Sequence, residues 1–149
     1  MQFPDKTAMA ETFEMMLGKE VDIVEVPHGV VKDRHPKTTY VYLNDSDEPT
    51  ILVEADLSLA HAAGAAMALI PPSRASDATE AGEPDVELLA NFKEVINILS
   101  ALLNDRNDVH VRLDPHETEM TGPPPTDLQA VFEIEIDRYD SGRIGFGAY

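Results

Sequence analysis

An acid and an amide stand three residues apart in the second half of the chain, Glu94 and Asn97, within a run of helical periodicity. Residues three apart are neighbours on a helix surface, so both side chains can reach one bound group. A carboxylate can grip a cation, and an amide, which is both donor and acceptor, can orient a water molecule. The pair is therefore a candidate for hydrolytic chemistry, although the spacing alone also fits the polar outer face of any amphipathic helix.

The pair falls on the longest helix that the sequence predicts, from Asp85 to Asn104, where Asp85 is suited to the N-cap position. One face of this helix carries an apolar stripe, which predicts burial of Leu88, Leu89, Phe92, Ile96, Leu99, Leu102 and Leu103. The opposite face is predicted to be polar or small, and it holds Glu87, Ala90, Asn91, Glu94, Asn97, Ala101 and Asn104. We therefore expect the pair to face solvent.

Apolar periodicity and turn residues divide the preceding chain into two helices and three strands. A first helix is predicted at 5–17, ended by Gly18, and an Ala-rich helix at 57–70, ended by two prolines. The strands are predicted at 21–26, 38–43 and 50–55, and the last two form a hairpin around a polar turn. Residues 73–84 show no periodicity and are predicted to be a mobile linker.

Two further strands are predicted after the long helix, at 109–113 and 131–136, joined by a Pro-rich loop at about 115–125. The glycine-spaced tail 141–149 is predicted to add an edge strand or to fray. The order of elements lacks the strict alternation of a parallel doubly wound sheet, and the hairpin favours antiparallel pairing. The sequence therefore predicts an α+β fold, an antiparallel β-sheet with helices packed on one face.

The composition limits the class of protein. The 149 residues suffice for a single domain, 1–149, and the absence of Cys excludes disulfides, thiolate metal sites and a cysteine nucleophile. The lack of disulfides favours a cytoplasmic location. No apolar run reaches the roughly 18 residues that a bilayer requires, so we expect a soluble protein without membrane insertion. The net charge of −17 repels phosphate backbones, which argues against nucleic acid as a partner and is typical of a solvated acidic surface.

The run 87–101 resembles the Glu-x-x-Asn helix of the CheC, CheX and FliY chemotaxis phosphatases, which act on the response regulator CheY. The surrounding elements are similar as well, because a helix ending near Gly18 and an Ala-rich helix ending at Ile70 precede it. The resemblance covers 12–104, about the first two-thirds of the chain, and it implies a CheX-like or CheC-like fold.

The resemblance implies a role for each member of the pair. By this resemblance, Glu94 would be the acid that contacts an active-site lysine of the regulator, and Asn97 would be the amide that positions the attacking water. The implied activity is that of an aspartyl-phosphate phosphatase, a hydrolase of two-component signalling whose partner is a phosphorylated, CheY-like response regulator. In-line displacement on an acyl phosphate needs mostly positioning and charge stabilisation. No cofactor of the chain's own is implied, and Mg²⁺ is expected on the partner.

Two positions depart from the family pattern. Ala90 stands four residues before Glu94, where the family has an acid or a serine, and Leu17 stands where a second Glu-x-x-Asn would place its amide after Glu14. The resemblance therefore implies one site, as in CheX. The alternative is a non-enzymatic docking or adaptor module of the same fold that binds a signalling or flagellar partner with this face.

Other polar residues are interpreted as structural or solvated rather than as catalytic or metal-binding. His110, Asp114, His116 and Glu117 match no compact metal-ligand motif, and we interpret them as solvated loop residues. His61, inside the Ala-rich helix, is interpreted as a helix-surface or hydrogen-bonded core histidine rather than a base. An edge strand that pairs between subunits would give a homodimer, which the sequence leaves open.

Overall fold

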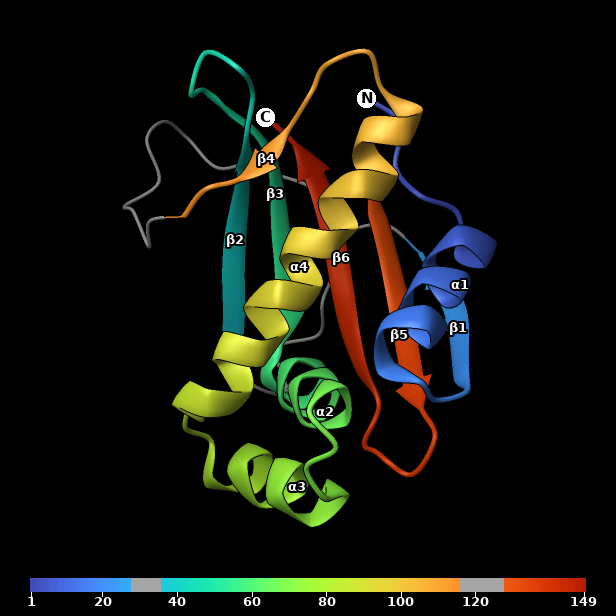
Figure 1. Ribbon diagram of the computed structural model, residues 1–149, viewed down its shortest axis with the longest axis vertical. Helices are drawn as coiled ribbons and strands as arrows, with labels where there is room; N and C mark the ends of the chain where they lie inside the picture. Colours follow the sequence, from blue (N-terminus) through green and yellow to red (C-terminus); the bar gives the residue numbers. More distant parts are fainter. Residues whose placement is uncertain (28–35, 116–127) are drawn as a thin grey trace.

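The computed structural model describes residues 1–27, 36–115 and 128–149 (Figure 1). The chain is α+β, as the sequence predicts, and its elements within these ranges follow the order α1 (Lys6–Leu17), β1 (Val21–Val26), β2 (Lys37–Leu43), β3 (Pro49–Asp56), α2 (Leu57–Met67), α3 (Pro72–Ala81), α4 (Val86–Arg106), β4 (Arg112–Leu113), β5 (Ala130–Ile136) and β6 (Gly142–Ala148). None of the helices in these ranges is both long enough and apolar enough to cross a membrane.

The six strands form one sheet in the order β1-β5-β6-β3-β2-β4, and every neighbouring pair is antiparallel. The predicted hairpin is β2 and β3, and its turn is closed by Asn44, whose side-chain oxygen accepts from the backbone N–H groups of Ser46 and Glu48. A short polar side chain of this kind replaces backbone partners in a tight turn. In the strand order, the hairpin lies in the half of the sheet that ends with β4.

Helices α1, α2 and α4 lie on one face of the sheet, and α3 packs against α2 at one end (Figure 1). The core fills the space between the sheet and these helices, and its large, fully buried side chains include Met9, Phe13, Tyr42, Leu59, Phe92, Leu99, Phe132 and Phe146. Helix α4 crosses the sheet diagonally, so its outer side forms the middle of this face of the molecule (Figure 1).

The ends of the helices follow from their capping residues. Asp5 and Asp56 accept hydrogen bonds from the third backbone N–H of α1 and α2, each at 2.8 Å, and so satisfy donors that a helix start leaves free. Gly18 ends α1 in the left-handed region at φ 63°, where the missing Cβ removes the steric cost. The sequence predicts these three boundaries correctly because caps are read from single residues. The predicted end of the Ala-rich helix at Ile70 is wrong, since α2 ends at Met67 and Leu69 has a left-handed φ of 58°.

The prediction of a mobile linker at 73–84 is wrong, because Pro72–Ala81 forms α3. Pro72 at the first helical position has its φ already fixed, and Ala75 is buried against α2. The segment shows no apolar stripe because it buries only one small residue. A short helix of this kind is stabilised by its neighbours rather than by its own pattern.

The C-terminal tail neither frays nor forms an edge, because β6 lies inside the sheet between β5 and β3. Its side chains Ile144 and Phe146 are fully buried. Gly142 lets β6 pass the start of α2 closely, since a Cβ at this position would lie 2.6 Å from the Leu59 Cβ and 2.3 Å from an oxygen of Asp56. Glycines that suggest a frayed tail therefore permit close packing.

The last predicted strand before the Pro-rich loop is shorter than expected, since only Arg112–Leu113 of 109–113 forms β4. The backbone of Val111 is bonded elsewhere: its N–H donates to Asn104 Oδ1 at 2.8 Å, and its C=O accepts from Asn104 Nδ2 at 3.0 Å. The predicted loop at 115–125 lies outside the described residues except for Pro115.

Candidate functional site

The predicted pair lies on the outer side of α4. Glu94 and Asn97 are both exposed, whereas Val95 and Ile96 between them are fully buried against the core. Neither side chain forms a hydrogen bond or ion pair within the described residues. An acid and an amide one turn apart are therefore presented to solvent together, which is the arrangement that the spacing predicts.

The residues one turn before and one turn after the pair have small side chains. Ala90 precedes Glu94 by one turn and Ala101 follows Asn97 by one turn, and both are exposed. Lys93 does not fold over Glu94, because its ammonium donates to the Pro115 carbonyl at 3.3 Å. Small neighbours allow another backbone or side chain to approach the pair closely.

Two other residues of the predicted polar face have structural roles instead. Asn91 is partly buried and donates to the Gly64 carbonyl of α2 at 3.1 Å, and Asn104 makes the two bonds to Val111 described above. Each amide therefore ties α4 to a neighbouring segment. The solvent-facing stripe is narrower than the sequence predicts, because these two asparagines lie at its margins.

Helices α2 and α4 cross in close contact at Gly64. A Cβ built on Gly64 would lie 2.1 Å from the carbonyl oxygen of Leu88, far inside van der Waals contact. This approach is possible only without a side chain, and the Asn91 bond to Gly64 reinforces it. The crossing fixes the first turn of α4 at Leu88, six residues before Glu94.

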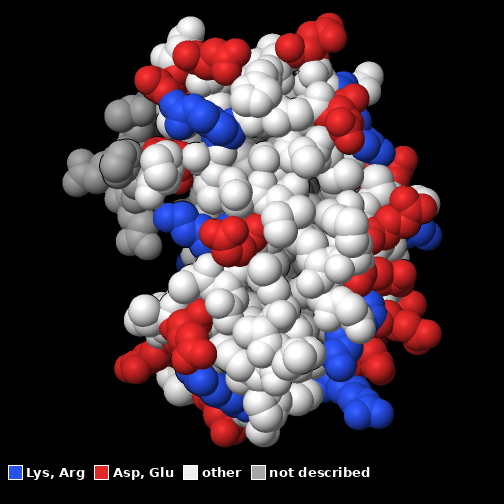
Figure 2. Space-filling view, in the orientation of Figure 1, with Lys and Arg blue, Asp and Glu red and all other residues white. Residues whose placement is uncertain are grey.

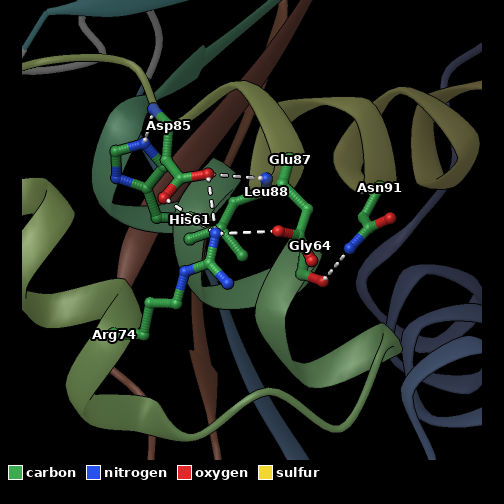
Figure 3. A network of polar contacts seen from close by, with 7 residues as sticks. All are labelled: His61, Gly64, Arg74, Asp85, Glu87, Leu88 and Asn91. Atoms are coloured by element: carbon green, nitrogen blue, oxygen red, sulfur yellow. Dashed lines mark hydrogen bonds and ion pairs between the residues drawn. The ribbon is translucent and has the colours of Figure 1, made fainter.

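The N-terminus of α4 is held by a polar network that joins three helices (Figure 3). Asp85 caps the helix by accepting from the Leu88 N–H at 3.1 Å. Arg74 of α3 donates to Asp85 at 3.3 Å and to Glu87 at 2.9 Å. The Leu88 hydrogen bond is the main cause that lowers the pKa of the Asp85 carboxyl, and Arg74 lowers it further. The acid therefore remains ionised and holds α3 against α4.

His61 of α2 completes this network from below and is fully buried. Its Nε2 accepts from the Asp85 backbone N–H at 3.1 Å, so this nitrogen carries no proton. The proton then resides on Nδ1, which donates to Thr79 Oγ1 at 3.1 Å, and Thr79 donates onward to the Ala75 carbonyl. Burial lowers the pKa of His61, while the nearby Asp85 opposes that shift. His61 is a neutral, hydrogen-bonded core histidine, as one of its two predicted roles requires.

The first helix carries no second pair of this kind. Leu17, at the place of the amide, is buried, and the Glu14 carboxylate accepts from the Val21 backbone N–H at 3.4 Å. Glu14 therefore helps to hold the turn between α1 and β1. The single solvent-facing acid-amide pair at this spacing in these two helices is Glu94 with Asn97.

Charge is unevenly distributed over this face. Figure 2 shows the face crossed by α4, where the centre is largely uncharged apart from an acidic spot, and most acidic side chains gather toward the rim. In a chain of net charge −17, an uncharged centre is a surface on which another protein can lie without strong repulsion.

The described residues contain no group of three or more His, Asp or Glu side chains arranged to hold a metal ion. His110 lies 3.1 Å from Asp45 in the hairpin turn and is exposed, while His116 and Glu117 lie outside the described residues. A lone exposed carboxylate such as Glu94 does not make a metal site by itself.

Solved structures resemble this chain throughout its length. The FliM middle domain from H. pylori matches with a TM-score of 0.59 at 14% identity, covering 95% of this chain and 82% of that chain. FliY from Thermotoga maritima matches with a TM-score of 0.54 at 17% identity, covering 92% and 80%. The chain has the fold of FliM and FliY.

FliM also matches in its complex with FliG from H. pylori, with a TM-score of 0.55 at 12% identity, covering 95% of this chain and 84% of that chain. No protein-family profile matches the sequence, and no curated protein matches it. At identities this low, the structural similarity shows the fold alone and says nothing of the chemistry of this chain.

Proposed function

We propose that the protein is an aspartyl-phosphate phosphatase that acts on a phosphorylated, CheY-like response regulator. The observation that carries the proposal is the exposure of Glu94 and Asn97, one turn apart on α4 and without partners within the described residues. The resemblance of the run 87–101 to the Glu-x-x-Asn helix of the CheC, CheX and FliY phosphatases gives these two residues their roles. The fold shared with FliY agrees with it.

The chemistry is an in-line displacement at phosphorus. The oxygen of a water molecule bonds to the phosphorus as the bond between phosphorus and the aspartyl oxygen breaks, and the products are the regulator's carboxylate and dihydrogen phosphate. Asn97 accepts a hydrogen bond from this water through Oδ1 and so directs a lone pair of the water at phosphorus. Glu94 pairs with a lysine of the regulator and thereby fixes the distance between the two proteins.

This reaction requires no covalent bond between the chain and the phosphoryl group, because it depends on positioning and charge stabilisation. Mg²⁺, held by the regulator, supplies charge neutralisation at the phosphoryl group. The helix contributes rigidity, since Val95 and Ile96 are fully buried and hold the exposed pair on a fixed surface.

A phosphate-release assay tests the proposal. The substrate is a CheY-type receiver domain phosphorylated on its aspartate, with Mg²⁺ present, and the rate is compared with and without this protein. We expect acceleration by the wild type, and a loss on the order of 100-fold for both Glu94→Ala and Asn97→Ala. Glu135→Ala is the matched control, because Glu135 is an exposed acid on β5, away from α4. Equal rates for the wild type and both site variants would refute the assignment.

The second candidate is a docking module without phosphatase activity. FliM, which shares the fold, is known in a complex with FliG, so the fold is compatible with protein binding. Ala90, at the position where the phosphatase family has an acid or serine, favours this reading. Binding of the receiver domain with no acceleration of phosphate release would select it over the enzyme.

A further inference from the structure

The two peptide groups on either side of Asn97 each accept a hydrogen bond from a side-chain hydroxyl. The carbonyl of Ile96, which precedes Asn97, accepts from the Tyr42 hydroxyl of β2. The carbonyl of Asn97 itself accepts from Ser100 Oγ at 2.6 Å. In an α-helix each carbonyl already accepts from the N–H four residues later, so these bonds are additional. Both bonds restrain the peptides next to one residue, Asn97, whose amide is proposed to position the water.

The Tyr42 bond anchors the middle of α4 to the sheet. Tyr42 is fully buried, and its neighbours in the ladder are Ile51 of β3 and Leu113 of β4. A buried hydroxyl is costly without a partner, so the ring cannot turn away from α4 at low cost. Burial raises the pKa of Tyr42 far above its ordinary value, so the hydroxyl stays a neutral donor. The Ile96 carbonyl is thereby held at a fixed height above β2.

The Ser100 bond acts on the next peptide from the outer side. Ser100 is only partly buried and lies one turn after Asn97. Its hydroxyl donates back to the Asn97 carbonyl and so restrains that peptide plane. The backbone of Asn97 is therefore restrained on both sides, by the buried Tyr42 hydroxyl before it and by the partly buried Ser100 hydroxyl after it.

We infer that Tyr42 and Ser100 are positioning residues for Asn97, a role that rests on the proposed phosphatase function. The two flanking peptides set the direction of the Cα–Cβ bond of Asn97. This direction determines the position from which the side-chain amide is presented. A displacement of about 1 Å in a positioning group is enough to cost on the order of 100-fold in rate. Because the Tyr42 hydroxyl is fully buried beneath α4, its loss changes the reaction step rather than the docking of the regulator.

The experiment compares Tyr42→Phe and Ser100→Ala with Tyr139→Phe in the phosphate-release assay. Tyr139 is the matched control, since its hydroxyl also donates to a backbone carbonyl, that of Ile70, at 2.6 Å, but away from Asn97. We expect Tyr42→Phe to lower kcat about tenfold with KM unchanged, Ser100→Ala to lower kcat less, and Tyr139→Phe to leave both unchanged. Phenylalanine keeps the buried ring, and Ile96 keeps its helical partner, so the variant retains the fold.

A double variant separates positioning from a general structural role. In the Asn97→Ala background, Tyr42→Phe should cause no further loss of rate, because the bond acts through the missing amide. An equal kcat for Tyr42→Phe and Tyr139→Phe, or an undiminished loss in the double variant, would overturn the inference while the phosphatase function stands. A wild type that gives no acceleration would overturn the proposed function and this inference together.

Discussion

The crossing of α2 and α4 at Gly64 allows two physical effects of opposite sign to be compared in one substitution. Gly64 lies inside α2, where helix propensity alone predicts that Ala is more stable by about 1 kcal/mol. The structure predicts the opposite, because the new Cβ would stand 2.1 Å from the Leu88 carbonyl oxygen. That oxygen belongs to the backbone of a packed helix and cannot swing aside as a flexible side chain does.

The cost of Gly64→Ala follows from the movement that it requires. Contact at about 3.2 Å or more demands that α2 and α4 separate by about 1 Å, and overpacking of this kind costs about 3 kcal/mol. The separation also weakens the Asn91 bond to Gly64, which contributes about 1 kcal/mol and offsets the gain in propensity. The net loss is therefore about 3 kcal/mol, which corresponds to a fall of about 10 °C in Tm for a chain of this length.

Thermal unfolding followed by circular dichroism measures this loss, and Gly18→Ala is the control. Gly18 has a left-handed φ of 63° with nothing within 4 Å of a built Cβ, so only backbone strain of about 1 kcal/mol is expected there, or about 3 °C. Because the crossing fixes the start of α4, Gly64→Ala should also slow phosphate release, whereas Gly18→Ala should not. A Tm for Gly64→Ala at or above that of Gly18→Ala would refute the packing argument.

Two further predictions concern residues whose sequence context suggests chemistry. Burial lowers the pKa of His61, so the unfolded chain binds the proton first, and stability should fall as the pH drops below about 6.5. Comparing Tm between pH 7.5 and 5.5 for the wild type and His61→Gln isolates this loss, and parallel curves would contradict it. Glu14→Ala should leave the rate of phosphate release unchanged, since Glu14 holds the backbone of Val21; a loss as large as that of Glu94→Ala would reveal a second site.

The elements that the sequence predicts correctly are those whose signal is local. An aspartate cap and an apolar stripe indicate each of the helices α1 and α4. The β2-β3 hairpin is indicated by β-branched and aromatic residues around a polar turn. The exposure of Glu94 and Asn97 follows from the same stripe, because residues opposite a buried face must meet solvent. One periodic pattern therefore predicts both the core side and the candidate site.

The elements that the sequence mispredicts are those fixed by distant partners. Helix α3 depends on Arg74 reaching the start of α4 and on Thr79 meeting His61 of α2, which no local pattern reveals. The interior position of β6 depends on Gly142 fitting against α2, although glycine spacing in isolation indicates a frayed end. Asn91 and Asn104 look like surface residues by periodicity, but their amides satisfy backbone groups of other segments. Tertiary contacts, either hydrogen bonds or close packing, decide all of these cases.

The candidate site consists of exposed side chains on a helix, and the fold does not determine which side chains stand there. Its chemistry is therefore hard to infer from the fold. FliM and FliY share the fold with this chain at 14% and 17% identity, so the scaffold is retained while almost all side chains differ. The scaffold's contribution is an outward-facing helix held by a glycine crossing at its start and a tyrosine bond at its middle. Under the proposed function, the two exposed side chains on this helix would decide whether a docked regulator loses its phosphoryl group. Because neither side chain contributes to the core, Glu94→Ala and Asn97→Ala should change the rate by orders of magnitude while leaving Tm nearly unchanged.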